Sequence, residues 1–298
     1  MEIGRQSGHP TQRHSWAGVI DRLRIEQGGE GQPADYGFRF KDGTEISLNA
    51  RIGGGFRIEF DGCIVCRYCD REGRRSFAGG YCYDCFKALA RCDLCVMSPD
   101  RCHYHLGTCR EPEWGDGFCM QPHLVYLANT SGTKVGITRR GMEQGRWLDQ
   151  GAIEALVILE APTRRAAGLA EVEIARLLPD RTDWRKMLRP DVPEQDLLET
   201  ARFLKTAGLS LADELRWIGA RSVHRFHYPF SDMPDKVESL KLTSGMIEGN
   251  LLGMKGQYLL LSCGALNIRQ HAGYQVHLTL DDEPFDLQQR KGTQLGLF

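Results

Sequence analysis

The sequence predicts a multidomain α+β fold, and three observations lead to this prediction. All but one of the 11 cysteines lie between Cys63 and Cys119. Segments near both ends of the chain alternate polar and apolar residues as strands do, whereas the stretch from Pro122 to Pro190 alternates strand-like and helix-like patterns. A chain of 298 residues also exceeds what one hydrophobic core usually supports. The predicted parts are an N-terminal β segment (1–62), a cysteine-rich module (63–121), a small β-β-α-β-α domain (122–190), a helical extension (191–220), a C-terminal β segment that pairs with the first (221–287) and a tail (288–298).

The two β segments share a spacing of residues. Residues 35–60 alternate around an Asp42-Gly43 turn signal, and residues 257–280 have the same character. Both contain the pattern N-x-R-x3-G-aromatic-x-[IV], with a tyrosine upstream. The matched residues are Tyr36, Asn49, Arg51, Gly55, Phe56 and Ile58 in the first copy, and Tyr258, Asn267, Arg269, Gly273, Tyr274 and Val276 in the second. We therefore expect two copies of one β unit in a single domain, from which the middle of the chain emerges as an insertion.

Strands and helices alternate in the middle of the chain. Residues 123–129 (HLVYLAN) and 133–138 (TKVGIT) are short apolar runs joined by a turn signal, which is typical of a hairpin. A helical stretch at 141–150 and a strand at 152–161 follow, and Thr163 is the predicted N-cap of the next helix. This order gives the predicted β-β-α-β-α domain.

The helical extension begins after this domain. Leu197, Ala201 and Leu204 fall on one helical face, and the pattern stops at Gly208. Ser210 has an acidic residue at capping-box distance, so a second short helix is expected to start there.

Two cysteine pairs have the spacing of a metal site. Cys66-x2-Cys69 is followed after twelve residues by Cys82-x2-Cys85. Two such knuckles bring four thiolates around one ion, the geometry that structural Zn²⁺ prefers. Cys63 lies at the same spacing from Cys66, so a shifted register stays open. An iron–sulfur cluster uses the same ligands, and the colour of the purified protein distinguishes the two.

A third cysteine pair predicts a second structural zinc ion. The favoured ligands of this ion are Cys92, Cys95, Cys102 and Cys109. His105 and Cys119 are alternative ligands for its last two positions. Closed thiolate sites leave no position for a substrate, so both ions are expected to stabilise the fold.

Four residues in the stretch 122–182 form an ordered set. Tyr126 lies in HLVYLAN, Lys134 begins the motif KVG, Arg146 lies in GRWLDQG, and Glu171 lies in LAEVEIARLLP. This order resembles the GIY-YIG nuclease superfamily. The tyrosine of that family's first motif matches Tyr126, its helical arginine matches Arg146 and its metal-binding glutamate matches Glu171. Lys134 stands where the second motif has a tyrosine.

The resemblance implies phosphodiester hydrolysis with Mg²⁺ or Mn²⁺. Glu171 would hold the divalent ion, Tyr126 would position or deprotonate the attacking water, and Arg146 would offset developing charge. Lys134 can contact a phosphate but is a different acid–base group from tyrosine. The wider arrangement of a cysteine block, CREPEWG and HLVYLANTSGTKVGITRR also resembles an uncharacterised family of bacterial proteins.

The charge pattern gives limited support to a nucleic-acid partner. The net charge of -1 argues against binding by bulk electrostatics. Basic residues slightly outnumber acidic ones between Pro122 and Pro190, and Arg139 and Arg140 are candidate contacts to a phosphate backbone. A solvated surface of mixed charge is the alternative interpretation.

The last five residues form a second short motif. The sequence Gln-Leu-Gly-Leu-Phe resembles the pentapeptide that binds the bacterial sliding clamp. In that reading Gln294 hydrogen-bonds to the clamp, while Leu295, Leu297 and Phe298 fill apolar pockets. A clamp partner would favour DNA over RNA as the substrate.

Composition excludes some classes of protein. No stretch approaches the roughly 18 apolar residues of a membrane-spanning helix, and the start has no apolar signal-peptide region. We expect a cytoplasmic, nucleoid-associated endonuclease that acts in DNA repair or at replication sites. The first alternative is a non-catalytic, zinc-dependent nucleic-acid-binding adaptor recruited to the clamp. A protein-interaction scaffold is the second.

Overall fold

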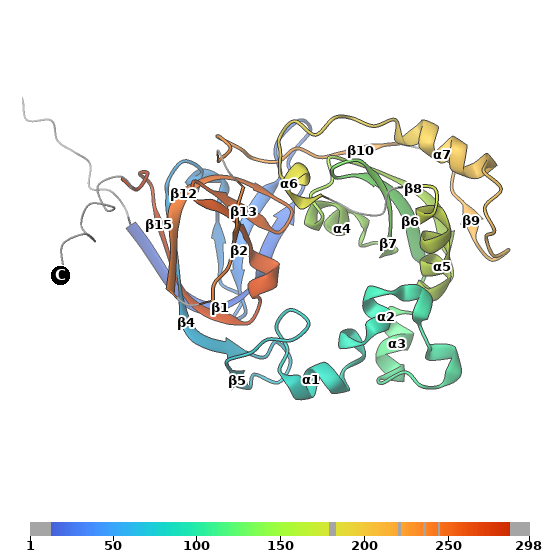
Figure 1. Ribbon diagram of the computed structural model, residues 1–298, viewed down its shortest axis with the longest axis horizontal. Helices are drawn as coiled ribbons and strands as arrows, with labels where there is room; N and C mark the ends of the chain where they lie inside the picture. Colours follow the sequence, from blue (N-terminus) through green and yellow to red (C-terminus); the bar gives the residue numbers. More distant parts are fainter. Residues whose placement is uncertain (1–12, 179–182, 220–221, 235–236, 244, 287–298) are drawn as a thin grey trace, which may run out of the picture.

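The structure is a mixed α+β arrangement with two β-sheets and a cysteine-rich module (Figure 1). In Figure 1 the larger sheet lies on the left, the second sheet on the right, and the module below them. No helix in the described part of the chain has the length and apolar character needed to cross a membrane. The computed structural model describes residues 13–178, 183–219, 222–234, 237–243 and 245–286.

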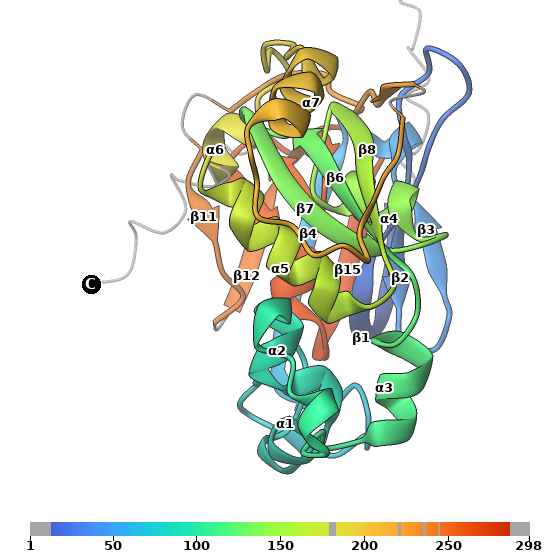
Figure 2. The same cartoon turned by 90° about the vertical axis from the view of Figure 1, so that its right-hand side faces the viewer.

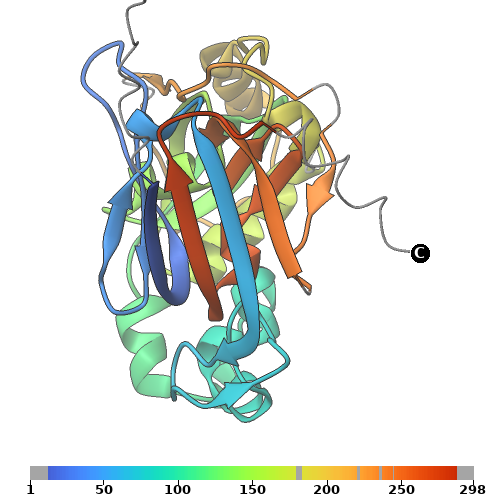
Figure 3. The same ribbon diagram turned by 90° about the vertical axis from the view of Figure 1, so that its left-hand side faces the viewer.

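The larger sheet contains ten strands from both ends of the described chain. Its strands are β1 (Arg13–Glu26), β2 (Asp35–Phe40), β3 (Glu45–Ser47), β4 (Gly55–Val65), β5 (Glu72–Gly73), β11 (Ser239–Leu240), β12 (Gly245–Lys255), β13 (Tyr258–Leu261), β14 (Gly264–Asn267) and β15 (Tyr274–Asp281). Two 3₁₀-helices accompany them, η1 (Asn49–Arg51) and η5 (Ile268–His271). The hydrogen-bonded order is β11-β14-β13-β12-β4-β15-β1-β2-β3, and β5 pairs with β4. Figure 3 shows β4 in light blue between the red β15 and the orange β12, so strands from the two ends alternate in one sheet.

The two β segments have the same order of elements. β1, the hairpin β2–β3, η1 and β4 correspond to β12, the hairpin β13–β14, η5 and β15. β4 pairs with β12 and β15 pairs with β1, so each copy places its last strand beside the other copy. Glu59 faces His277 in the β4–β15 ladder, and their separation in sequence equals that of the matched Asn49 and Asn267. The two copies are therefore related by an approximate two-fold axis near this pair.

Alternation along β2 builds the core of the larger sheet. Tyr36, Phe38 and Phe40 are buried, and each buried aromatic ring contributes about 2 kcal/mol of hydrophobic stabilisation. The long strand β1 pairs with β15 in its first half and with β2 in its second. The ladder to β2 is irregular between Ile20 and Arg22, which is a bulge of the kind that bends a strand.

The second sheet carries the middle of the chain. Its strands are β6 (His123–Asn129), β7 (Thr133–Arg139), β8 (Glu154–Ala161), β9 (Arg216–Trp217) and β10 (His224–Arg225), and its helices are α4 (Glu143–Asp149), α5 (Arg164–Ala175), α6 (Trp184–Met187) and α7 (Leu197–Thr206). The strand order is β10-β8-β6-β7, with β9 beside β8, so β7 lies at one end of this order. The elements β6, β7, α4, β8 and α5 follow the order β-β-α-β-α. Thr163 caps α5, because its hydroxyl oxygen accepts a hydrogen bond from the Ala166 amide.

The two faces of the second sheet pack against different partners. Val125 and Leu127 of β6 share a core with α5 and α7, which lie in front of the sheet in Figure 2. Tyr126 and Ala128 point to the other face and join Trp147 of α4 in the core of the larger sheet. One face of the second sheet therefore packs into the core of the larger sheet, and its other face forms a second core with α5 and α7.

The helix expected at Ser210 is absent. Residues 209–215 contain no helix, and β9 follows them. Leu209, Leu211 and Leu215 pack against the core around α5 and α7. Packing of these partly buried leucines in an irregular segment outweighs the local capping signal.

The cysteine-rich module connects the two sheets. Its elements are α1 (Tyr83–Ala88), η2 (Ala90–Cys92), α2 (Leu94–Met97), η3 (Pro99–Arg101), η4 (Tyr104–Leu106) and α3 (Pro112–Phe118). The module begins where β4 ends, and α3 leads into β6. η3 packs on α5 at Gly168, where an added Cβ would lie 2.6 Å from Pro99 Cβ. The module therefore contacts the second sheet through a close helix contact that requires glycine.

Candidate functional site

Four elements of the second sheet bring the predicted site residues together. Tyr126 comes from β6, Lys134 from β7, Arg146 from α4 and Glu171 from α5. Tyr126 is fully buried, and its hydroxyl lies 2.9 Å from the side-chain amide of Gln150. With the amide nitrogen directed to that hydroxyl, the amide oxygen accepts from Arg146 Nη2 at 3.1 Å and Nε at 3.2 Å. Gln150 thus links the phenol and the guanidinium.

Glycine in the second motif has a steric role. Gly136 of β7 stands opposite Tyr126 of β6. A Cβ at position 136 would lie 2.7 Å from the tyrosine hydroxyl oxygen and 2.8 Å from Cζ. The missing side chain lets the phenol lie across β7, at the edge of the sheet.

The four side chains influence one another's protonation. Burial raises the pKa of Tyr126, and the nearby Arg146 opposes this shift. Burial, with the charge of Arg146, lowers the pKa of Lys134 to about 8, and Glu171 acts in the opposite direction. Burial also raises the pKa of Glu171, although Arg146 and Lys134 both stabilise its carboxylate. The site is a partly desolvated group of charges with more cations than carboxylates, which suits an anionic ligand.

Two further residues of this site have no signal in the spacing of the sequence. Asp100 and Arg164 both act on the pKa of Glu171, in opposite directions. Asp100 belongs to η3, and a Cβ at Gly168 would lie 2.7 Å from its backbone nitrogen. Arg164 of α5 donates to the Val96 carbonyl at 2.7 Å. The cysteine-rich module therefore borders the site, through a contact that depends on tertiary packing.

Arg139 and Arg140 have partners within the protein. The Arg139 guanidinium lies 5.3 Å from the ring centre of Phe118, and Arg140 Nη1 donates to Glu160 at 2.8 Å. Glu160 also pairs with Arg216. These contacts hold both arginines beside α3 and β8.

The first cysteine cluster contains four thiols that could hold a metal ion. The sulfur atoms of Cys66, Cys69, Cys82 and Cys85 all lie within 4.8 Å of one another. Cys66 and Cys85 are buried, and the Cys82 amide donates to Cys66 Sγ at 3.3 Å. Burial raises the pKa of the Cys66 thiol, but donation from backbone amides outweighs it and lowers the value to about 6. Burial raises the pKa of Cys85. This arrangement resembles a zinc ribbon and fits a structural zinc ion.

The remaining cysteines of the module divide differently from the prediction. Cys92 packs beside Cys66, Cys85 and Leu89 in the core of the first cluster. A second group borders a small cavity of about 10 Å³, roughly the size of one water molecule. The cysteines of this second cluster are Cys95, Cys102, Cys109 and Cys119.

Other possible ligands lie close to the second cluster. Asp93, Cys95 and His103 have ligand atoms within 4.8 Å of one another. His105, an alternative ligand in the sequence prediction, does not line the cavity, whereas Cys119 does. Cys92, at the end of η2, packs beside the first cluster, whereas Cys119, at the C-terminal end of α3, lines the second cavity.

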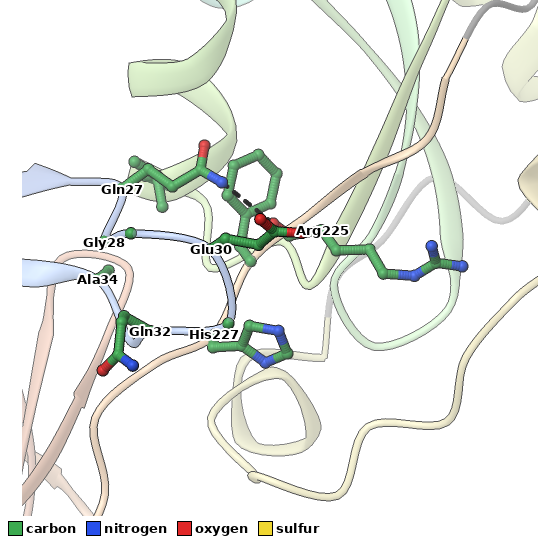
Figure 4. A pocket seen from close by; sticks show the side chains of 11 residues that line it. Gln27, Gly28, Glu30, Gln32, Ala34, Arg225 and His227 are labelled. Carbon is green, nitrogen blue, oxygen red and sulfur yellow. Dashed lines mark hydrogen bonds between the residues drawn. The ribbon is translucent and has the colours of Figure 1, made fainter.

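A separate cavity of about 280 Å³ lies between the two sheets. It is lined by the β1–β2 loop, Leu148 of α4 and residues 225–227 (Figure 4). Gln27 Nε2 donates to the Arg225 carbonyl at 3.5 Å across one side. None of the four predicted catalytic residues lines this cavity.

The chain belongs to an uncharacterised protein family. Residues 53–276 match the family model described as "Protein of unknown function (DUF2797)". No curated protein and no solved structure matches the chain. The matched region contains the whole cysteine-rich module and the second sheet.

Proposed function

We propose that this protein is a metal-dependent endonuclease that hydrolyses phosphodiester bonds in DNA during repair or at replication sites. The observation that carries the proposal is the convergence of Tyr126, Lys134, Arg146 and Glu171 from four elements at the β7 edge. Their order along the chain and the β-β-α-β-α arrangement resemble the GIY-YIG nuclease superfamily. The steric need for Gly136 beneath Tyr126 adds a physical reason for the second motif.

Each residue has a distinct part in the proposed reaction. Burial disfavours the ionised form of Glu171, and a bound cation would stabilise it. Glu171 would therefore hold Mg²⁺ or Mn²⁺, with Asp100 close by. A divalent ion bound there would supply positive charge to the phosphate. Arg146 would offset charge that develops on the phosphate oxygens. The raised pKa of Tyr126 keeps its hydroxyl protonated at neutral pH, which favours positioning of the water over proton abstraction.

The test is cleavage of defined substrates by the full chain. Branched, nicked and single-stranded DNA, and RNA of the same sequence, are incubated with the protein in Mg²⁺ or Mn²⁺. We expect DNA cleavage, and a loss of at least about 100-fold in Glu171→Gln with unchanged zinc content. Glu173→Gln is the matched control, because Glu173 lies on the same helix but pairs with Arg176. Equal loss in both variants would refute the assignment of Glu171.

A non-catalytic adaptor is the second candidate, and Lys134 is the observation that favours it. A lysine at this position contacts phosphate without replacing the phenol of the second motif. Tight DNA binding without cleavage by the natural chain would support the adaptor. If the Lys134→Tyr variant then cleaves DNA while the natural chain does not, this one substitution separates the two functions.

We also propose that the two cysteine clusters hold structural zinc. The first cluster has a complete set of four sulfurs, and the second has four cysteines around a cavity large enough for one ion. Elemental analysis should give two zinc ions per chain and no iron. A coloured protein with iron and sulfide would replace zinc with an iron–sulfur cluster.

The proposed route to DNA is the C-terminal pentapeptide. Gln294, Leu295, Leu297 and Phe298 lie outside the described residues, so this proposal rests on their resemblance to the sliding-clamp motif. A titration with purified bacterial clamp should show binding that is lost when residues 294–298 are deleted. Unchanged affinity after the deletion would refute it.

A further inference from the structure

Arginines from separate parts of the chain gather beside α4. They belong to β1, to the segment that follows β4, to α4 and to η5. The residues are Arg22, Arg67, Arg146 and Arg269. Figure 1 shows η5, the short orange-red helix, on the side of the larger sheet that faces α4.

A buried glutamine fixes β1 against α4. Gln257 donates to the Leu23 carbonyl at 2.8 Å and accepts from the Leu23 amide at 3.0 Å. The same side chain donates to Asp149 Oδ1 at 2.8 Å. Arg22 precedes Leu23 in β1, and Arg146 lies one turn before Asp149 in α4. This polar bridge therefore holds the backbone segments that carry Arg22 and Arg146 in a fixed relation.

The other two arginines approach the same helix. Arg269 Nη1 lies 3.8 Å from Asp149 Oδ2. A Cβ at Gly80 would lie 2.4 Å from Arg67 Cδ and 2.9 Å from the Ala272 carbonyl oxygen. The Arg67 side chain thus passes close to the end of η5, which carries Arg269.

Few carboxylates balance this group. Among the described residues, Asp149 pairs with Arg269, and Asp21 pairs with Arg67 at 2.9 Å and with Arg22 at 3.9 Å. Glu171 of the candidate site interacts electrostatically with Arg146. Arg24, two residues from Arg22, has three carboxylate partners. Those partners are Glu26, Asp35 and Glu45. Arg24 is neutralised within the fold, whereas the gathered arginines keep an excess of positive charge.

Three of these arginines reach solvent. The side chains of Arg22, Arg67 and Arg269 are 53%, 34% and 59% exposed. Partial burial of the Arg269 side chain lowers its pKa, Asp149 raises it, and the like charges of Arg146, Arg67 and Arg22 lower it further. Bringing like charges together costs free energy, and a bound polyanion would reduce this repulsion.

We infer that Arg22, Arg67 and Arg269, which we name the arginine patch, bind the phosphate backbone of a nucleic-acid strand whose reacting phosphate lies at Arg146. This inference rests on the proposed function and adds a contact surface on the larger sheet and the cysteine-rich module. Guanidinium groups bind phosphate oxygens without reading bases, so the contact is independent of sequence.

Binding of labelled DNA without divalent ions tests the patch. The variant Arg22→Gln/Arg269→Gln avoids Arg67, which adjoins the first cysteine cluster. The matched control is Arg13→Gln/Arg189→Gln, because these arginines are 52% and 62% exposed and each pairs with one aspartate. The slope of log affinity against log salt is negative, and each lost phosphate contact makes it less steep by about 0.7 to 0.9. The patch variant should bind roughly tenfold more weakly at about 0.1 M salt, with a slope reduced by about 1.5, and the control should bind as the natural chain does.

The outcomes separate this inference from the proposed function. Equal affinity and salt slope in the patch variant and the natural chain would overturn the patch while leaving the endonuclease assignment intact. A natural chain that binds neither DNA nor RNA would overturn both. Tighter binding of RNA than of DNA, with the same loss of affinity in the patch variant, would support the patch and identify RNA as the bound strand.

Discussion

The two cysteine clusters differ in what builds them. The first combines two knuckles, and its four sulfurs approach one another within 4.8 Å. The second draws its cysteines from a longer stretch around a cavity, and its neighbour η3 packs on α5 of the second sheet. The sulfurs of the first cluster therefore come from two neighbouring knuckles, whereas the second cluster also depends on contacts with the second sheet.

This difference bears on function as well as on stability. The segment between Cys95 and Cys102 contains η3 and therefore Asp100, which lies near Glu171. Arg164, close to Cys119 and Cys95, also reaches Glu171 electrostatically. A change at the second cluster should therefore affect the candidate site, whereas a change at the first should affect the module's own fold and the position of Arg67 in the arginine patch.

Removal of two ligands from the first cluster is expected to have the largest effect. Cys69→Ser/Cys82→Ser should lose one zinc ion and unfold residues 66–92, because the segment has few large buried side chains besides Leu89. Zinc content and hydrogen exchange measure this change. Cys263→Ser, at an exposed cysteine of the larger sheet, is the control. Full zinc content with normal protection in the double variant would contradict the prediction.

Single substitutions distinguish the ligands of the second cluster. Cys119→Ser should lower the zinc content from two ions to one, because Cys119 lines the second cavity. Cys92→Ser should keep both ions, because Cys92 packs beside the first cluster as an apolar side chain. Loss of one ion in Cys92→Ser, with both ions kept in Cys119→Ser, would instead support the ligand set that the sequence predicts, which includes Cys92 and leaves out Cys119.

The contact between η3 and α5 can be tested at Gly168. An alanine there would place its Cβ 2.6 Å from Pro99 Cβ, so Gly168→Ala should destabilise the protein by about 1–3 kcal/mol. Gly145→Ala on α4 is the control, because no atom lies within 4 Å of its added Cβ. That change should be neutral or slightly stabilising. Urea unfolding of the two variants measures the difference, and equal stability would argue against the close packing of η3.

Local patterns predicted the elements of the second sheet better than their packing. The apolar runs of β6 and β7 and the Thr163 cap depend on neighbours in sequence, so they could be read directly. The helix expected from Ser210 is wrong because burial of the surrounding leucines prevails. The sequence predicts β1 only as part of a β segment, because the change of partner at its bulge depends on tertiary contacts.

The candidate site shows the same limit. The ordered positions of Tyr126, Arg146 and Glu171 could be predicted because each lies in a recognisable strand or helix. Asp100 and Cys119 reach their places through the packing of η3 on α5 and through the second cavity, and no spacing in the sequence specifies these contacts. Long-range packing, which sequence periodicity does not encode, decides the second cluster.

The smallest effect is expected from a histidine at the junction of this cluster and the second sheet. His123 is fully buried, and its Nδ1 donates to the Gln121 carbonyl at 2.7 Å. Its Nε2 has no hydrogen-bond partner among the described residues. Burial, with the charges of Arg164 and Arg139, lowers the pKa of His123 to about 4, whereas in the unfolded chain it is about 6.5.

Because the folded state resists protonation of His123, stability should fall as the pH drops from about 6.5 toward 4. Linkage gives a loss of about 0.7 kcal/mol between pH 7 and pH 6, and about 2 kcal/mol by pH 5. His123→Asn keeps a donor near Nδ1 and removes the titration. Urea unfolding at pH 7, 6 and 5 should therefore show the variant losing less stability than the natural chain. A constant difference between the two chains at all three pH values would mean that His123 does not titrate at this junction.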